Sequence, residues 1–243
     1  MKSWTGKRYW LIGASEGLGA ALARQLSRTG VHVILSARRE EALKEVAESL
    51  PGPSTVLPLD VTDGEGLRKA AETAGEIDGM VYLAGAYWPF GANDWNHEQA
   101  ETMADVNFGG AMRAVGAVLP GMKARGHGHI VLTGSLTAYG GLPGAAPYVA
   151  TKAGIMALAE SLRCDLQGSG IEVQLINPGY IRTRLTDKND FRMPGMMEPD
   201  VAARTAFEHM NSTGFARAFP TWFSFVFRGA RFLPGWLYFR LFG

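Results

Sequence analysis

The sequence has little cysteine, almost no excess charge and no long apolar run, and each shortage excludes a class of protein. Its 243 residues contain one cysteine, Cys164, so neither an intramolecular disulfide nor a cysteine-based zinc site can form. Lys and Arg number 24 against 23 Asp and Glu, and this net charge of +1 removes the simplest argument for nucleic-acid binding. No stretch of about 18 uncharged apolar residues occurs, so we expect no membrane-spanning helix.

The first residues also lack the pattern of an export signal. Residues 1–6 are short and polar and lead at once into an apolar segment. A secretory leader instead needs a charged start, an apolar stretch and a small-residue cleavage site. Together with the lone cysteine, this favours a cytoplasmic location.

What the sequence does contain is a regular alternation of strand and helix patterns. With 47% hydrophobic residues, the chain is long enough to bury the core of one domain. Near-continuous apolar runs predict strands buried on both faces, at residues 31–35, 77–84, 129–133 and 171–176, with weaker candidates at 9–12 and 55–59. Helical periodicity fills the intervals. The pattern predicts an α/β fold, a single doubly wound parallel sheet with helices on both faces, and a ligand site at the carboxyl ends of the strands.

A glycine-rich turn follows the first predicted strand and opens the first predicted helix. Gly13 permits a sharp turn, and Gly17 and Gly19 let the backbone approach a ligand closely. The unpaired N–H groups and the positive dipole end of a helix start can hold a pyrophosphate. The spacing is G-x-x-x-G-x-G and not the G-x-G-x-x-G fingerprint, so on this motif alone a glycine-rich turn without a ligand is an equal alternative.

The end of the second predicted strand favours one form of dinucleotide. An acid at this place would hold the ribose 2′-hydroxyl of NAD, whereas arginine accommodates the 2′-phosphate of NADP. Ala37 stands where the acid is expected, and Arg38 and Arg39 follow it. The sequence therefore favours NADP(H) over NAD(H). Glu16 argues the other way, because it places negative charge near the same phosphate, and a solvated arginine pair is the alternative.

Four polar residues are candidates for the reacting group. Tyr148 and Lys152 are four residues apart at the start of a helical pattern, so they lie on one helix face. A free phenol has a pKa of about 10, and a nearby ammonium should lower it. Ser135 follows the strand at 129–133, at a carboxyl strand end, and Asn107 could anchor a water or a backbone carbonyl.

In this combination and order, the motifs resemble those of the short-chain dehydrogenase/reductase family over roughly residues 7–220. The resemblance implies a Rossmann-like fold, a catalytic group of Asn107, Ser135, Tyr148 and Lys152, and a nicotinamide cofactor without a metal. It also implies the cofactor-binding residues, which are Gly13, Ser15, Gly17, Leu18, Gly19, Arg38, Arg39, Asp60, Val61, Ala84, Gly85, Tyr148, Lys152, Pro178, Gly179, Ile181 and Thr183.

The reaction that the resemblance implies is hydride transfer between NADP(H) and a ketone, an aldehyde or a secondary alcohol. During reduction Tyr148 would protonate the forming alkoxide, and Ser135 would donate a hydrogen bond to the same oxygen. Lys152 would lower the Tyr148 pKa and bind the nicotinamide ribose. Asn107 is expected to fix a water that connects Lys152 to solvent.

Two positions depart from the family pattern. Ile12 stands where the family usually has Thr, and Leu83 stands where it usually has Asn. Leucine cannot make the polar contacts of an asparagine. The sequence therefore does not determine which hydrogen bonds hold the backbone beneath the cofactor.

The substrate side is expected to be apolar. Within a catalytic domain of residues 1–220, we expect a mobile lid at about residues 184–211. The side chains predicted to line an adaptable substrate pocket are Tyr87, Trp88, Phe191, Met193, Met196 and Met197. Core packing is an equal alternative for the methionines.

The C-terminal segment differs in composition from the rest. Residues 215–243 hold 11 of the 25 aromatic residues and four arginines, with no Asp or Glu. Residues 215–219 predict the last strand, and residues 221–243 form an aromatic, basic extension. Such a segment suits packing on its own domain or on a partner subunit, contact with a membrane surface, or a cover over the substrate site. The resemblance also implies a homodimer or a homotetramer.

The leading hypothesis is thus an NADP-preferring carbonyl reductase or alcohol dehydrogenase. One alternative is an NADP(H)-sensing protein without turnover, which the intact Ser135, Tyr148 and Lys152 disfavour. Another is an epimerase or dehydratase of the extended branch of the family. That branch usually has a longer substrate domain than 243 residues provide.

Overall fold

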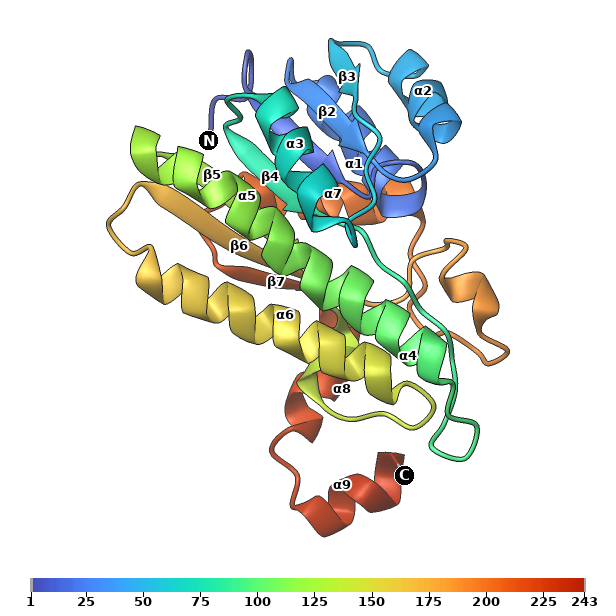
Figure 1. The fold of residues 1–243 in the computed structure, drawn as a ribbon. Coiled ribbons are helices and arrows are strands. Elements are labelled where there is room, and N and C mark those ends of the chain that lie inside the picture. Colours follow the sequence, from blue (N-terminus) through green and yellow to red (C-terminus); the bar gives the residue numbers. More distant parts are fainter. Residues whose placement is uncertain (1, 243) are drawn as a thin grey trace.

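A computed structural model describes residues 2–242, which are built around a seven-stranded parallel sheet (Figure 1). The order across the sheet is β3-β2-β1-β4-β5-β6-β7. This is the doubly wound α/β fold that the sequence predicts. The strands are β1 Arg8–Ile12, β2 His32–Ser36, β3 Ser54–Val56, β4 Gly79–Tyr82, β5 Gly128–Thr133, β6 Ile171–Pro178 and β7 Ala216–Phe219. The strand order reverses between β1 and β4, which is where ligands bind in open sheets of this kind.

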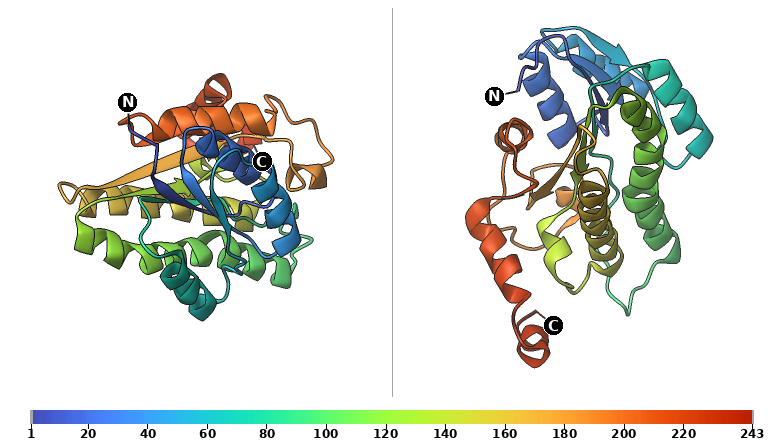
Figure 2. Two further views of the ribbon diagram at one scale, coloured as in Figure 1. Left: turned by 90° about the horizontal axis from the view of Figure 1, so that it is seen from above. Right: turned by 90° about the vertical axis from the view of Figure 1, so that its left-hand side faces the viewer.

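Helices cover both faces of the sheet, as the end-on view in Figure 2 shows. One face carries α3 (Gly64–Ala74), α5 (Gly110–Arg125) and α6 (Ala146–Asp165), and the other carries α1 (Gly17–Ser27), α2 (Glu40–Glu48) and α7 (Pro199–Met210). Because side chains alternate along a strand, neighbouring residues of β1 enter opposite cores: Trp10 packs with the first group of helices and Leu11 with the second.

One of the two weaker predicted strands, β1, lies near the centre of the sheet. β1 pairs with β2 on one side and β4 on the other, with Trp10 opposite Ile34 and Met80. The indole N–H of Trp10 would be costly to bury without a hydrogen-bond partner. It donates to Ser36 Oγ at 2.8 Å. The unusual aromatic residues of β1 are therefore compatible with full burial.

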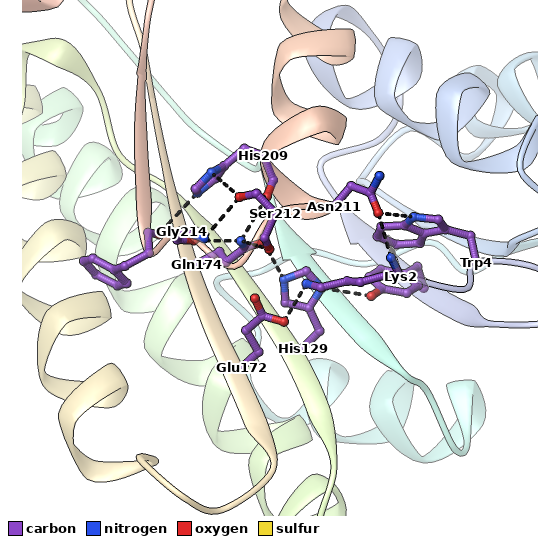
Figure 3. A network of polar contacts seen from close by, with 11 residues as sticks. Lys2, Trp4, His129, Glu172, Gln174, His209, Asn211, Ser212 and Gly214 are labelled. Carbon is purple, nitrogen blue, oxygen red and sulfur yellow. Dashed lines mark hydrogen bonds and ion pairs between the residues drawn. The ribbon is translucent and has the colours of Figure 1, made fainter.

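A closed polar network joins the amino-terminal parts of β1, β5 and β6 to the end of α7 (Figure 3). Tyr9 Oη and His129 Nδ1 are 2.9 Å apart, and His129 Nε2 is 2.9 Å from Gln174 Oε1. Gln174 Nε2 in turn donates to the carbonyls of His209, Ser212 and Gly214. Since an amide oxygen only accepts, the imidazole N–H is assigned to Nε2, and Nδ1 accepts from the phenol. Burial lowers the pKa of His129 to about 3, so the ring is neutral.

The chain continues past the last strand into two short helices that extend beyond the sheet (Figures 1 and 2). α8 (Thr221–Ala230) buries Phe223, Ser224 and Ala230, whereas α9 (Gly235–Phe242) has no buried residue. α9 is held to the body by a hydrogen bond from Tyr238 Oη to the carbonyl of Gly141. Within residues 2–242, no helix has both the length and the apolar composition to cross a membrane.

Candidate active site

A large cleft opens at the carboxyl ends of the strands. Its volume is about 1520 Å³, more than the 300–1000 Å³ of a typical small-molecule pocket, so it has room for a dinucleotide and a second ligand. The cleft wall includes every residue predicted to bind the cofactor, from Gly13 to Thr183, and also Ser135. Asn107 lies behind this wall and is fully buried.

The glycine turn is shaped by close backbone contacts. Gly13 has a φ of +100°, and a Cβ added there would lie 2.4 Å from the amide nitrogen of Ala84. A Cβ at Gly19 would lie 2.0 Å from the Gly13 carbonyl oxygen. α1 begins directly after Glu16, whose side chain does not cap the helix. The turn therefore presents uncapped N–H groups at a helix start, as an anionic diphosphate requires.

The two candidate arginines differ in their partners. Arg39 pairs with Glu16 at 2.8 Å, and the same carboxylate pairs with Arg184 at 2.6 Å. Arg38 is exposed on the cleft and makes no ion pair or side-chain hydrogen bond with any residue in 2–242. Of the pair, Arg38 is thus the cation without an internal anion.

Tyr148, Lys152 and Ser135 meet at the carboxyl end of β5. α6 begins at Ala146, so Tyr148 and Lys152 lie one above the other on its first turns. Lys152 is buried, and its Nζ donates to the carbonyl of Thr133 at 2.9 Å and lies 5.7 Å from the centre of the Tyr148 ring. Ser135 follows β5, and its hydroxyl is held by Thr137 Oγ1 at 3.0 Å.

Burial controls the protonation of this cluster. It raises the pKa of Tyr148 to about 12, against the opposing effect of a hydrogen bond with Ser135. Burial also lowers the pKa of Lys152 to about 8. The lowering of the Tyr148 pKa that we expected from Lys152 is not found, because burial of the phenol has the larger effect. The phenol is protonated at neutral pH, the form that a proton donor needs.

Asn107 acts on the backbone that borders the cleft. It lies in a π-helical turn, Ala104–Gly109, between α4 (His97–Met103) and α5. Its Oδ1 accepts from the amide of Ala86 at 2.7 Å, and its Nδ2 donates to the carbonyl of Ala86 and to Thr151 Oγ1. Both amide hydrogens are therefore used, and one lone pair of Oδ1 is left for a water. The carbonyl contact expected from the sequence is present.

The two departures from the family pattern are accommodated by packing. Ile12 is buried, and the partly buried Leu83 side chain packs against the core on the α1 side. The Leu83 amide donates to the Ile12 carbonyl at 2.7 Å. The backbone beneath the cleft is thus held without an asparagine at residue 83.

The residues predicted to contact the substrate divide into two groups. Tyr87, Trp88 and Phe191 line the cleft, and the Tyr87 ring lies 4.9 Å from that of Tyr148. Met193, Met196 and Met197 do not line it. Met197 pairs with Ile181 in a β-bridge and packs on the core, which is the alternative we considered for the methionines.

The expected lid segment also has two parts. Residues 184–191 border the cleft, and Lys188 Nζ donates to the Tyr87 carbonyl at 2.7 Å. α7 instead buries Ala202, Ala203 and Ala206 in the core beside α1. Any movement over the cleft therefore belongs to the residues before α7, and lid mobility itself stays a prediction.

Some wall residues were not identified from the sequence. Leu142 lies in a loop that no motif marks, Tyr180 lies between the predicted residues Gly179 and Ile181, and Phe223 and Phe227 come from α8. The spacing of Phe223 and Phe227, four residues apart, does indicate one helix face. What the sequence lacked was any signal that this face meets the cleft.

Comparison with known proteins agrees with this arrangement. The family model of short chain dehydrogenases matches residues 7–192. An uncharacterized oxidoreductase of Myxococcus xanthus is 36% identical over 235 residues, which cover 94% of this chain and 93% of that protein. Among solved structures, a short chain dehydrogenase of Burkholderia cenocepacia in complex with NADP has a TM-score of 0.88 at 23% identity, over 100% of both chains. A gluconate 5-dehydrogenase of the same organism, in complex with NADP and tartrate, has a TM-score of 0.75 at 25% identity and covers 84% of this chain and 88% of its own.

The matched region contains the glycine turn, Ser135, Tyr148 and Lys152, so the family model and the geometry of the cleft concern the same residues. Members of the family bind a nicotinamide cofactor. This chain belongs to the short-chain dehydrogenase family and is an oxidoreductase.

Proposed function

We propose that this protein is an NADP(H)-dependent carbonyl reductase or alcohol dehydrogenase in which Tyr148 is the general acid and base. The observation that carries the proposal is the meeting of Tyr148, Ser135 and Lys152 on the wall of a cleft that begins at the glycine turn. A structural tyrosine would not need a buried lysine and a serine beside it, at the end of a strand where ligands bind.

The residues of the cleft fit a dinucleotide. The close-packed glycine turn and the uncapped start of α1 suit a diphosphate, and Asp60 and Val61 border the expected adenine end. Pro178, Gly179 and Ile181 also line the cleft, and Thr183 borders Gly17 of the glycine turn. A bound nicotinamide would supply or accept the hydride, and the protein would supply the proton.

Two side chains act on the substrate oxygen. The Tyr148 hydroxyl gives its proton to the substrate oxygen as that oxygen gains negative charge. Ser135 donates a hydrogen bond to the same oxygen and so stabilises the charge as it develops. The Lys152 ammonium lies 5.7 Å from the centre of the Tyr148 ring and would bind the nicotinamide ribose. Asn107 holds the Ala86 backbone and, through Thr151, the first turns of α6.

The preference for NADP(H) rests on Arg38. It is the cleft arginine without an internal anion, and no acid stands at Ala37 to hold a ribose 2′-hydroxyl. The NADP complex of the gluconate 5-dehydrogenase, which is similar to this chain, is consistent with that choice.

A coenzyme comparison tests the preference. Arg38→Ala should raise the KM for NADPH about ten-fold or more and leave the KM for NADH nearly unchanged, because only the phosphate makes a charged contact. Arg39→Ala is the matched control and should have a smaller effect, since Arg39 already pairs with Glu16. Equal turnover with NADH and NADPH in the unmodified protein would contradict the preference.

The substrate is proposed to carry apolar bulk next to its carbonyl or alcohol group. Tyr87, Trp88 and Phe191 from the loops and Phe223 and Phe227 from α8 supply the apolar wall. Oxidation of NADPH with a panel of apolar ketones and aldehydes is the deciding assay. Tight NADPH binding without turnover of any compound would favour the sensing protein instead. We also propose that the enzyme acts in the cytoplasm as a homodimer or homotetramer.

A further inference from the structure

α8 is apolar on both of its faces, although only one face is covered. Phe223 and Phe227 point into the body of the molecule and line the cleft. On the other face, Trp222, Phe225 and Val226 are exposed by 60%, 61% and 50%. A helix with apolar residues on every face is normally buried on every face. The exposed outer face of α8 therefore indicates that a second apolar partner covers it.

α9 and the residues that link it to α8 also expose large apolar side chains. Phe232, Trp236, Phe239 and Leu241 are between 62% and 87% exposed. Both helices lie at the same end of the molecule, beyond the carboxyl ends of the strands (Figures 1 and 2). We call the exposed side chains of α8, α9 and their link the C-terminal patch. Scattered single apolar residues are normal on a surface, whereas a group of this kind marks an interaction site.

The charged residues of the C-terminal patch are all positive. Arg228, Arg231 and Arg240 are exposed, and none of them forms an ion pair within residues 2–242. Residues 221–242 contain no Asp or Glu, and the neighbouring loop at 136–147, which Tyr238 contacts, contains no charged residue. A partner for this surface must therefore be apolar and bring negative charge.

A second copy of the chain does not meet that requirement. In a two-fold symmetric contact the same patch is present on both copies, so the patch of the second copy would bring further arginines and no acid. An anionic lipid surface meets both conditions. Trp and Phe reside at the boundary of headgroups and acyl chains, and arginines near that boundary pair with the anionic headgroups.

We propose that the C-terminal patch docks the enzyme on an anionic lipid bilayer and holds the apolar wall of the cleft close to the lipid. The second part of this proposal, the substrate class, rests on the proposed function. Since Phe223 and Phe227 line the cleft from the inner face of the docking helix, the substrate class is a long-chain or polycyclic carbonyl compound or alcohol dissolved in the bilayer.

Co-sedimentation with vesicles tests docking without reference to catalysis. The full chain should sediment with vesicles of mixed phosphatidylcholine and phosphatidylserine and stay largely in the supernatant with phosphatidylcholine alone. The double variant Trp236→Ser/Phe239→Ser should bind at least about ten-fold more weakly, because two large apolar side chains no longer enter the lipid. Val201→Ser, at an exposed apolar residue of α7, is the matched control and should bind like the unmodified chain.

The charged part of the patch is tested separately. Each arginine replaced by Gln should weaken binding about five-fold. Arg68→Gln, at an exposed residue of α3, should have no effect. Equal thermal stability of all variants shows that they are folded, and neither Trp236 nor Phe239 lines the cleft, so turnover of a short water-soluble ketone should be unchanged.

Two results would overturn the proposal. One is that the full chain sediments with neither kind of vesicle. The other is that the unmodified chain is a dimer in analytical ultracentrifugation and the double variant is a monomer, which would assign the patch to a subunit interface. If the chain docks but oxidises NADPH with no carbonyl compound, docking stands and the proposed function fails. If the chain docks and is active, the double variant should lose kcat/KM only for ketones presented in anionic vesicles, and equal loss for water-soluble ketones would contradict the substrate assignment.

Discussion

At the amino-terminal end of the sheet, each side-chain polar atom of Tyr9, His129 and Gln174 has a hydrogen-bond partner. At the carboxyl end of two of the same strands, Thr133 Oγ1 and Asn177 Oδ1 are buried with none. An unpartnered buried polar atom costs about 1–3 kcal/mol, whereas a satisfied network rigidifies its surroundings. Lys2 Nζ and Arg8 Nε, at the amino-terminal end, likewise have no hydrogen-bond partner, although Lys2 forms an ion pair. The difference therefore lies between the Tyr9, His129 and Gln174 network, which is fully satisfied, and the carboxyl end of β5, where Thr133 lines the candidate active site with an unpartnered hydroxyl.

The largest expected effect is a loss of activity, and it distinguishes Tyr148 at the carboxyl end of the sheet from Tyr9 at the amino-terminal end. Tyr148→Phe should lower kcat/KM by about 10³ while NADPH binding and thermal stability stay close to those of the unmodified protein, because only the proton donor is lost. Tyr9→Phe is the matched change at the other end, and it should leave kcat/KM unchanged. It should lower the free energy of unfolding by about 1–2 kcal/mol, because His129 Nδ1 loses its partner. Retained turnover in Tyr148→Phe would contradict the proposed mechanism.

Gln174→Leu should have the largest effect on stability. The change removes the acceptor of His129 Nε2 and the donor to three carbonyls, all of them buried or partly buried. We expect the free energy of unfolding to fall by about 3 kcal/mol or more, measured by urea denaturation. The kcat of the folded fraction should be unchanged, since the network lies at the opposite end of the sheet from Tyr148. A loss of kcat with unchanged stability would contradict the assignment of this network to stability and not to activity.

The amino-terminal network should also make the protein sensitive to acid. Burial lowers the pKa of His129 to about 3, below its unfolded value of 6.5, so the unfolded state binds more protons between these pH values. The stability is therefore fully present above pH 6.5 and falls as the pH decreases, with a slope of up to about 1.4 kcal/mol per pH unit. His129→Asn should have a shallower slope of unfolding free energy against pH. His209 adds to the slope in both proteins, because burial lowers its pKa as well.

The smallest expected effect is a gain of stability at the candidate active site. Burial lowers the pKa of Lys152 to about 8, so the folded state holds this charge at a cost at neutral pH. Lys152→Met should raise the free energy of unfolding by about 1 kcal/mol at pH 7 while abolishing turnover. In the unmodified protein, stability should rise between about pH 8 and pH 10.5, where the unfolded state binds more protons, and this rise should be absent from the variant. Lower stability of the variant at pH 7 would show that the hydrogen bond to Thr133 outweighs the cost of burial.

The fold was predictable because it depends on local patterns, and the site residues were predicted because their motifs, in this order, resemble those of a known family. Apolar runs separated by helical periodicity determine a parallel sheet, and the glycine turn, Ser135 and the pair Tyr148 and Lys152 all follow strand ends. The direction of the Lys152 ammonium was not predictable, since it depends on a carbonyl 19 residues away. The position of the methionines at 193, 196 and 197 outside the cleft lining was not predictable for a similar reason. Residue type does not distinguish a flexible pocket side chain from core packing.

The polar network at the amino-terminal end left no signal in the sequence. Tyr9, His129 and Gln174 lie on three strands that become neighbours only after the sheet has formed. The sequence places His129 only at the start of a predicted strand, and its hydrogen-bond partners are far away along the chain. Contacts between strands distant in sequence thus limit what periodicity alone can predict.

Glu16 bridges two arginines from different parts of the cleft wall, Arg39 after β2 and Arg184 after Thr183. These two ion pairs tie the segment after Thr183 to the opening of α1 and to the end of β2. Because Arg39 is already engaged in this bridge, a nucleotide phosphate at this end of the cleft would find its cation at Arg38 and leave the bridge intact.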